Sequence, residues 1–180
     1  MKRFLSALFF LAGSAHAADV DLAGAFRRAV QSSKGLEAFR AVCRSPGGGL
    51  NFDGDDRLAK AVLDAGTAVA ARAALYAESH CTDGASRLGV RGTLGNEFLL
   101  AHPAALAEAL AAEKTPSAFY ASLVESEPAE FFAIDCKVSH CEKERRAAFA
   151  KKRTALEGAN VSGAAKASRD RLLQALKSDR

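Results

Sequence analysis

The chain has 180 residues, a length typical of one domain of ordinary size. Its 25 Lys and Arg face 21 Asp and Glu, so the net charge is only +4, and we expect no nucleic-acid partner. Trp is absent, Ala is frequent, β-branched residues are few, and no segment alternates cleanly between apolar and polar residues. Because Ala favours helix and β-branched residues favour strand, the composition predicts an all-α fold essentially without sheet.

The first residues have the layout of a secretory signal peptide. Lys2 and Arg3 precede the apolar run Phe4–Ala12, and Ala15-His16-Ala17 has the small-x-small pattern of a cleavage site. The apolar run is too short to cross a membrane, which takes about 20 apolar residues. We therefore expect residues 1–17 to be cleaved. Residues 18–180 would then form a single helical domain of net charge +2 without a membrane span, periplasmic or secreted.

Helical spacing of apolar residues predicts the elements of the first half. From Leu22 to Cys43 the spacing predicts one bent helix or two short ones, and the sequence SPGGG at 45–49 must end it. A second helical pattern begins within 53–56 and continues to Tyr76, and Gly66 is expected to bend or divide it.

Prolines, glycines and capping residues set the expected boundaries of the second half. These boundaries are, in order, a cap at Thr82 or Asp83, a stop and restart at His102-Pro103, a cap at Thr115 with Pro116 in the first helical position, a short helix opened by Glu127-Pro128, a turn over 136–141, a long charged helix to about Glu157, and a break over 158–163.

One stretch has a familiar pattern. Residues 82–110 combine the cap Asp83-Gly84, a helix rich in Gly and Leu, and the sequence His102-Pro103-Ala104-Ala105-Leu106. This stretch resembles uncharacterised exported bacterial proteins built from short antiparallel helices, which are loosely similar to HEAT repeats, and the charged helix after Cys141 is faintly similar too. The resemblance supports an all-helical fold and implies no activity. We expect about seven to eight short helices packed as antiparallel pairs and held by disulfides.

Four cysteines in an exported chain predict two disulfides, among Cys43, Cys81, Cys136 and Cys141. Of the three possible pairings we expect Cys43–Cys81, between two helix ends, and Cys136–Cys141, across a short turn. The alternative is a zinc site formed by Cys136, His140 and Cys141 together with Cys81 or His80. Structural zinc sites favour two short C-x₂₋₄-C units, and this chain has one C-x₄-C unit, so we expect disulfides and no metal or other cofactor.

Two further patterns have simple structural interpretations. Asn51, Asp53 and Asp55 alternate like the first ligands of a calcium loop, but Asp56 and Val62 stand where that loop has Gly and Glu, so we interpret the stretch as helix capping. The basic stretch 143–153 is interleaved with acidic residues. We interpret it first as a solvated helix face and second as a patch for an anion or an acidic partner.

Candidate catalytic residues are few. Glu78-Ser79 and Glu125-Ser126 are similar to the catalytic Glu-Ser of helical peptidoglycan-cleaving transglycosylases, but the Gly-Leu-Met-Gln type run of that family is absent. Ser79 and His80 lie near Asp83, and because the chain has no G-x-S-x-G elbow we interpret them as parts of a polar loop. His102, before a proline, is expected to be a helix-end residue and not a ligand.

The leading hypothesis is therefore an exported, non-enzymatic helical protein that binds another envelope or secreted protein, as an accessory, inhibitor or immunity-type protein does. The alternative is an envelope enzyme acting on peptidoglycan or another polysaccharide, with Glu78 or Glu125 as its acid. A clustered pair of buried carboxylates in a deep cleft would favour the enzyme, and a shallow apolar groove between helix pairs would favour the binding protein.

Overall fold

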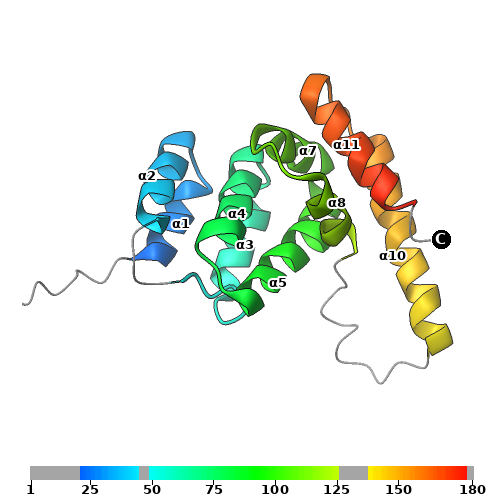
Figure 1. Ribbon diagram of the computed structural model, residues 1–180, viewed down its shortest axis with the longest axis horizontal. Coiled ribbons are helices and arrows are strands. Elements are labelled where there is room, and N and C mark those ends of the chain that lie inside the picture. Colours follow the sequence, from blue (N-terminus) through cyan, green and yellow to red (C-terminus); the bar gives the residue numbers. More distant parts are fainter. Residues whose placement is uncertain (1–20, 45–48, 126–137, 178–180) are drawn as a thin grey trace, which may run out of the picture.

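The computed structural model describes residues 21–44, 49–125 and 138–177, and all regular structure within these ranges is helical (Figure 1). The predicted all-α fold is confirmed. The expected signal peptide, residues 1–17, and the expected short helix after Glu127-Pro128 lie outside the described residues. Among the described helices, none is long and apolar enough to cross a membrane.

The first two helices form a hairpin at one end of the structure (Figure 1). They are α1 (Leu22–Ala29) and α2 (Ser33–Cys43), so the expected helix over this stretch is two short ones. The break falls at Ser32, whose side chain caps α2 by accepting the backbone N–H of Gly35. Gly35 lies within the first turn of α2, where a Cβ would come within 2.3 Å of the Arg28 carbonyl oxygen. The glycine therefore lets the two helices pack closely.

The helix α4 lies at the centre of the N-terminal part. Gly66 divides α3 (Asp56–Ala65) from α4 (Ala68–His80), as expected, and it ends α3 in the left-handed conformation with φ 58°. The ring of His102 occupies the space where a Cβ on Gly66 would lie, 2.6 Å from that position. Helix α4 packs against α1, α2, α3, α5 and α7. Small side chains permit this close packing, and the fully buried ones are Ala70, Ala71, Ala73, Ala74 and Ala77.

A continuous helix follows, made of α5 (Gly84–Gly92), a π-helical segment η1 (Thr93–Phe98) and α6 (Leu99–Ala101). Asp83 is its cap, since its side chain accepts the Ser86 N–H. Val90, Leu94 and Phe98 are buried on one line, whereas Ala101, which continues the same helical spacing, is exposed. A π-helical turn holds more residues than an α-helical turn, so the positions that face the core shift after η1, where Leu99 is buried and Ala101 is not.

His102-Pro103 separates this helix from α7 (Pro103–Ala112), as expected. The predicted start of α8 (Ser117–Val124) is wrong by one residue, because Pro116 is the cap and not the first helical residue, and no side chain caps the helix. Pro116 has an extended backbone with ψ 147°, so the helical conformation begins only at Ser117.

The last two helices, α10 (Val138–Gly158) and α11 (Gly163–Ala175), form an antiparallel pair at the other end of the structure (Figure 1). Helix α10 begins before Cys141, so the expected turn over 136–141 is wrong from Val138 onward. No Gly or Pro interrupts the sequence between Val138 and Gly158. Helix α11 packs against α7 and α8. One contact in this interface joins the Tyr120 and Ser168 hydroxyls, 3.0 Å apart.

A disulfide joins Cys43 to Cys81, with 5.5 Å between their Cα atoms. This is the pairing that the sequence predicts, and it ties the C-terminal ends of α2 and α4 together. Cys141 is disulfide-bonded as well. Its expected partner, Cys136, lies outside the described residues, so the second pairing stays a prediction.

Candidate functional site

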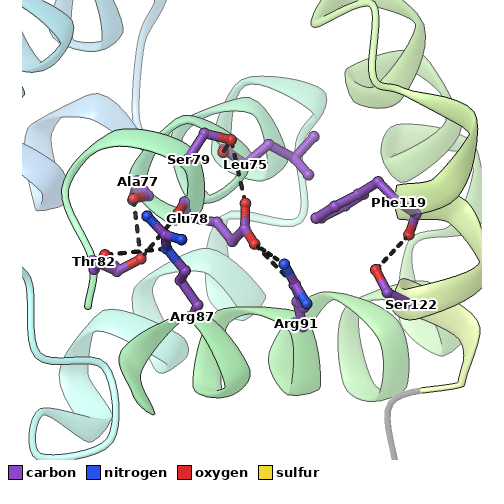
Figure 2. Close-up of polar contacts among 9 residues, drawn as sticks. All are labelled: Leu75, Ala77, Glu78, Ser79, Thr82, Arg87, Arg91, Phe119 and Ser122. Carbon is purple, nitrogen blue, oxygen red and sulfur yellow. Dashed lines mark hydrogen bonds and ion pairs between the residues drawn. The ribbon is translucent and has the colours of Figure 1, made fainter. Parts of the chain in front are cut away.

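The buried glutamate Glu78 belongs to an ion pair between α4 and α5 (Figure 2). Only 5% of Glu78 is exposed. Its Oε1 accepts hydrogen bonds from Arg91 Nη2 at 2.5 Å and Nε at 2.8 Å, and its Oε2 lies 3.2 Å from the donating Ser79 hydroxyl. The guanidinium of Arg91 also lies 5.4 Å from the ring centroid of Phe119 on α8. Both carboxylate oxygens of Glu78 are therefore engaged by donors of this chain.

The second candidate acid, Glu125, is exposed just after the end of α8. The two glutamates thus differ in burial and do not form the clustered pair of buried carboxylates that would favour an enzyme. Glu78 holds α4 against α5, and a carboxylate with three donors around it makes a strong structural contact.

Ser79, His80 and Asp83 have different partners, and the single proton of the Ser79 hydroxyl goes either to Glu78 or to the Leu75 carbonyl. The Ser79 hydroxyl lies 3.1 Å from the Leu75 carbonyl, and His80 Nδ1 lies 3.1 Å from the Tyr76 carbonyl. Asp83 caps α5, and the Ser86 N–H holds the pKa of its carboxyl below the usual value. These contacts agree with the interpretation of a polar helix end and its cap.

A small cleft opens between α4 and the turn that joins α7 to α8. Its volume is about 120 Å³, and it is lined by Leu75, Tyr76, Ser79, His80, Glu113, Thr115, Pro116 and Phe119. The rings of Tyr76 and His80 are stacked at 4.1 Å, nearly parallel, on one wall. We call this space the α4–α8 cleft.

Three guanidinium groups contact Tyr76 and Glu113, two of the residues that line the α4–α8 cleft. Glu113 Oε1 accepts from Arg40 Nη2 at 2.5 Å and from Arg72 Nε at 2.7 Å. Arg44 Nε donates to the Tyr76 hydroxyl at 2.6 Å, and the Arg40 guanidinium lies 5.0 Å from the centroid of the Tyr76 ring. We call Arg40, Arg44, Arg72, Tyr76, His80 and Glu113 the Tyr76 cluster. Sequence reasoning missed it, because its members come from three helices far apart in the chain.

A larger, open cleft lies between α10 and α11. Its volume is about 480 Å³, and its lining consists of three arginines, one glutamate and three apolar residues: Glu142, Arg145, Arg146, Phe149, Ala150, Arg153 and Leu176. Arg153 Nη2 donates to the Leu176 carbonyl at 3.3 Å, which joins the two helices. We call this the α10–α11 cleft. The basic stretch 143–153 is therefore more than a solvated helix face, because one of its sides lines this cleft.

Lys152, in the same basic stretch, is 2% exposed. Its Nζ donates to the Val124 carbonyl at the end of α8 at 2.8 Å, and burial lowers its pKa to about 8. The lysine therefore joins α10 to α8.

The acidic residues before α3 cap helices and turns. Asn51 Oδ1 accepts from the Gly54 N–H at 2.8 Å, and Asp55 caps α3 by accepting the Arg57 N–H. Side-chain bonds from Arg57 hold the pKa of Asp55 below its usual value. His102 packs on Gly66 and lies 5.2 Å from the Phe98 ring, as expected for a helix-end residue.

No group of three or more His, Cys, Asp or Glu residues that could hold a metal occurs in the described part of the chain. The alternative zinc site depends on Cys136, which lies outside that part, and on His140, whose side chain is not described. Comparisons with protein-family models, with curated proteins and with solved structures gave no match for this chain.

Proposed function

We propose that the chain is an exported protein, periplasmic or secreted, that acts by binding an acidic segment of another envelope or secreted protein in its α10–α11 cleft. The observation that carries the proposal is the lining of this cleft, where three arginines and one glutamate surround apolar side chains. The layout of the first residues and the Cys43–Cys81 disulfide support the exported location, because disulfides persist in oxidising compartments.

Charge complementarity selects an acidic occupant. A guanidinium binds a carboxylate through two parallel N–H donors, which provides geometric specificity as well as energy. The three arginines of the cleft lie along one face of α10 and outnumber its single carboxylate, that of Glu142, which pairs with Arg146. A basic partner would meet like charge at the same positions, so it is disfavoured.

The apolar part of the cleft selects a segment that also carries an aromatic or aliphatic side chain. Phe149 lies in the cleft with the Arg145 guanidinium 5.9 Å from its ring centroid, and Leu176 faces it from the end of α11. Binding energy at protein interfaces concentrates in a few such apolar and arginine contacts. The volume of about 480 Å³ falls within the range of about 300–1,000 Å³ typical of binding pockets.

The helices that form this cleft are held in place. Leu156 of α10 and Leu172 of α11 are fully buried, and α11 packs on α7 and α8. Binding to a surface that is already ordered loses less conformational entropy. These features support the interaction function more than the enzymatic alternative, since Glu78 does not line the α4–α8 cleft and that cleft has a volume of only about 120 Å³.

A defined probe tests the proposal. A fluorescently labelled peptide, in which glutamates flank a single phenylalanine, is titrated with the purified protein, and its anisotropy reports binding. We expect Arg145→Glu with Arg146→Glu to weaken binding at least about tenfold. The matched control is Arg28→Glu with Lys34→Glu, which makes the same change of charge at exposed positions of α1 and α2 and should have little effect. An equal loss in both pairs of variants, or no binding, would contradict the proposal.

A further inference from the structure

The lining of the α10–α11 cleft follows the period of a helix. All of its residues except Leu176 belong to α10, at positions 142, 145, 146, 149, 150 and 153. Residues three and four apart are neighbours on a helix surface, so these positions form one continuous stripe along α10. Leu176 directly follows the last residue of α11. The cleft is therefore a stripe on one helix, bordered by the end of the other.

The stripe lies mostly on a part of α10 that adds no side chain to the core. Among the described side chains of residues 141–151 none is buried, whereas Lys152 and Leu156, further along the helix, are. Figure 1 shows the first half of α10, in yellow, extending beyond the end of α11. Helices in proteins owe most of their stability to the packing of one face. This half of α10 thus offers a face on which a partner can pack.

A helix suits this surface better than an extended strand. The backbone groups of α10 are bonded within the helix, so an extended segment would find few partners there for its own N–H and C=O groups. Buried backbone groups without partners are unfavourable, whereas a helix satisfies its own. Side chains on one side of a strand also repeat about every 7 Å, while those of a helix repeat about every 5.4 Å, as the stripe on α10 does.

The side chains along the stripe define the matching face of the partner. Arg145 and Arg146 lie one turn before Phe149 and Ala150, and Arg153 lies one turn after them. Ala150 is small and leaves room beside the Phe149 ring for one large apolar side chain. The matching helix therefore has an aromatic or aliphatic residue at its centre and an Asp or Glu three or four residues to either side. At 1.5 Å per residue the stripe is about 16 Å long, which is the length of about three helical turns.

We propose that the occupant of the α10–α11 cleft is an amphipathic acidic helix of about three turns, which packs along the first half of α10 and forms a three-helix arrangement with α10 and α11. This inference rests on the function proposed above and adds the conformation of the partner and the spacing of its anchors. Free helices shorter than about 12–15 residues are marginal in water, so the partner segment gains helix when it binds.

Three labelled peptides of about 16 residues test the conformation. The first has Phe and Glu at helical spacing on one face. The second has the same composition in an order that alternates apolar and acidic residues, as a strand does. The third is the first with a central Ala replaced by Pro, which breaks a helix interior. By fluorescence anisotropy the first should bind at least tenfold more tightly than the other two. The circular dichroism of its complex should show more helix than the sum of the separate spectra.

Two protein variants test the placement along α10. Ala150→Glu puts a negative charge in the middle of the stripe and should weaken binding of the first peptide at least tenfold. The matched control, Ala147→Glu, makes the same change at an exposed position of α10 outside the lining and should weaken it less than threefold.

The outcomes separate this inference from the function on which it rests. Equal binding of the helical and the alternating peptide, or no gain of helix, overturns the helical partner and leaves an acidic segment as the occupant. An equal loss in the Ala150 and Ala147 variants overturns the packing along α10. If none of the three peptides binds, both the helical partner and the proposed function are wrong.

Discussion

Removing the Cys43–Cys81 disulfide should destabilise the protein strongly. The bond joins residues 38 positions apart, and for a loop of this length the chain-entropy model gives about 4 kcal/mol at 25 °C. For a chain of this size, 1 kcal/mol shifts the melting temperature by about 2–4 °C, so Cys43→Ala with Cys81→Ala should lower it by about 8–16 °C. The expected Cys136–Cys141 bond closes a very short loop, for which the same model gives only about 2 kcal/mol.

Thermal unfolding followed by far-ultraviolet circular dichroism, without reductant, measures both pairs of variants. The variant that lacks Cys43 and Cys81 should melt at a lower temperature than the variant that lacks Cys136 and Cys141. Peptide mapping without reductant gives the pairing directly. An equal or larger loss in the Cys136 and Cys141 variant, or a peptide that links Cys81 to Cys136 or Cys141, would refute the reasoning.

Other side chains give predictions of comparable precision. Gly35→Ala should lower the free energy of unfolding by about 1–3 kcal/mol, because its Cβ would lie 2.3 Å from a backbone oxygen of α1. A Cβ at Gly92 would meet nothing within 4 Å, so Gly92→Ala should raise the free energy of unfolding by up to about 1 kcal/mol. Denaturant titration measures the effect of both glycine substitutions. By the same measurement, Glu78→Gln should lower the free energy of unfolding by about 1–3 kcal/mol, because a buried ion pair loses its anion. Glu125 is exposed, so Glu125→Gln should change the free energy of unfolding by less than about 0.5 kcal/mol. Loss of a peptidoglycan-cleaving activity in either folded variant would instead favour the enzyme. Finally, burial lowers the pKa of Lys152 to about 8 in the folded chain, against 10.5 ordinarily. Between pH 8 and pH 10.5 the unfolded chain therefore binds more protons than the folded chain, and the free energy of unfolding should rise with pH. The slope should reach at most about 1.4 kcal/mol per pH unit, and pH-dependent denaturant titration should show that this contribution is missing in Lys152→Met.

The helix boundaries that depend on local chemistry could be predicted from the sequence. Gly66 divides α3 from α4, Asp83 caps α5, and His102-Pro103 starts α7. In each case the residue acts on its own backbone or on that of its near neighbours. The start of α8 differs from the prediction by one residue, because Pro116 has an extended backbone and so precedes the first helical residue, Ser117.

The candidate sites could be predicted only in part. The basic stretch 143–153 was recognised as a possible patch, but its cleft depends on where α11 packs. The Tyr76 cluster could not be foreseen, because Glu113 takes its partners Arg40 and Arg72 from 73 and 41 residues away. Pairing between helices so distant in sequence is set by the tertiary packing of α2, α4 and α7, which spacing along one chain does not reveal. The π-helical turn at η1 was missed for a similar reason, since apolar spacing assumes a uniform α-helix.

Site-specific photo-cross-linking in cells that produce the protein tests the proposed interaction function most directly. A photoreactive residue replaces exposed Ala150 in the α10–α11 cleft, and the control replaces exposed Ala41 on α2. The account predicts an adduct from position 150 alone, formed with an acidic segment of an exported protein and lost when Arg145 and Arg146 are changed to Glu. Adducts that form equally from both positions, that survive the charge reversal, or that do not form at all would contradict it.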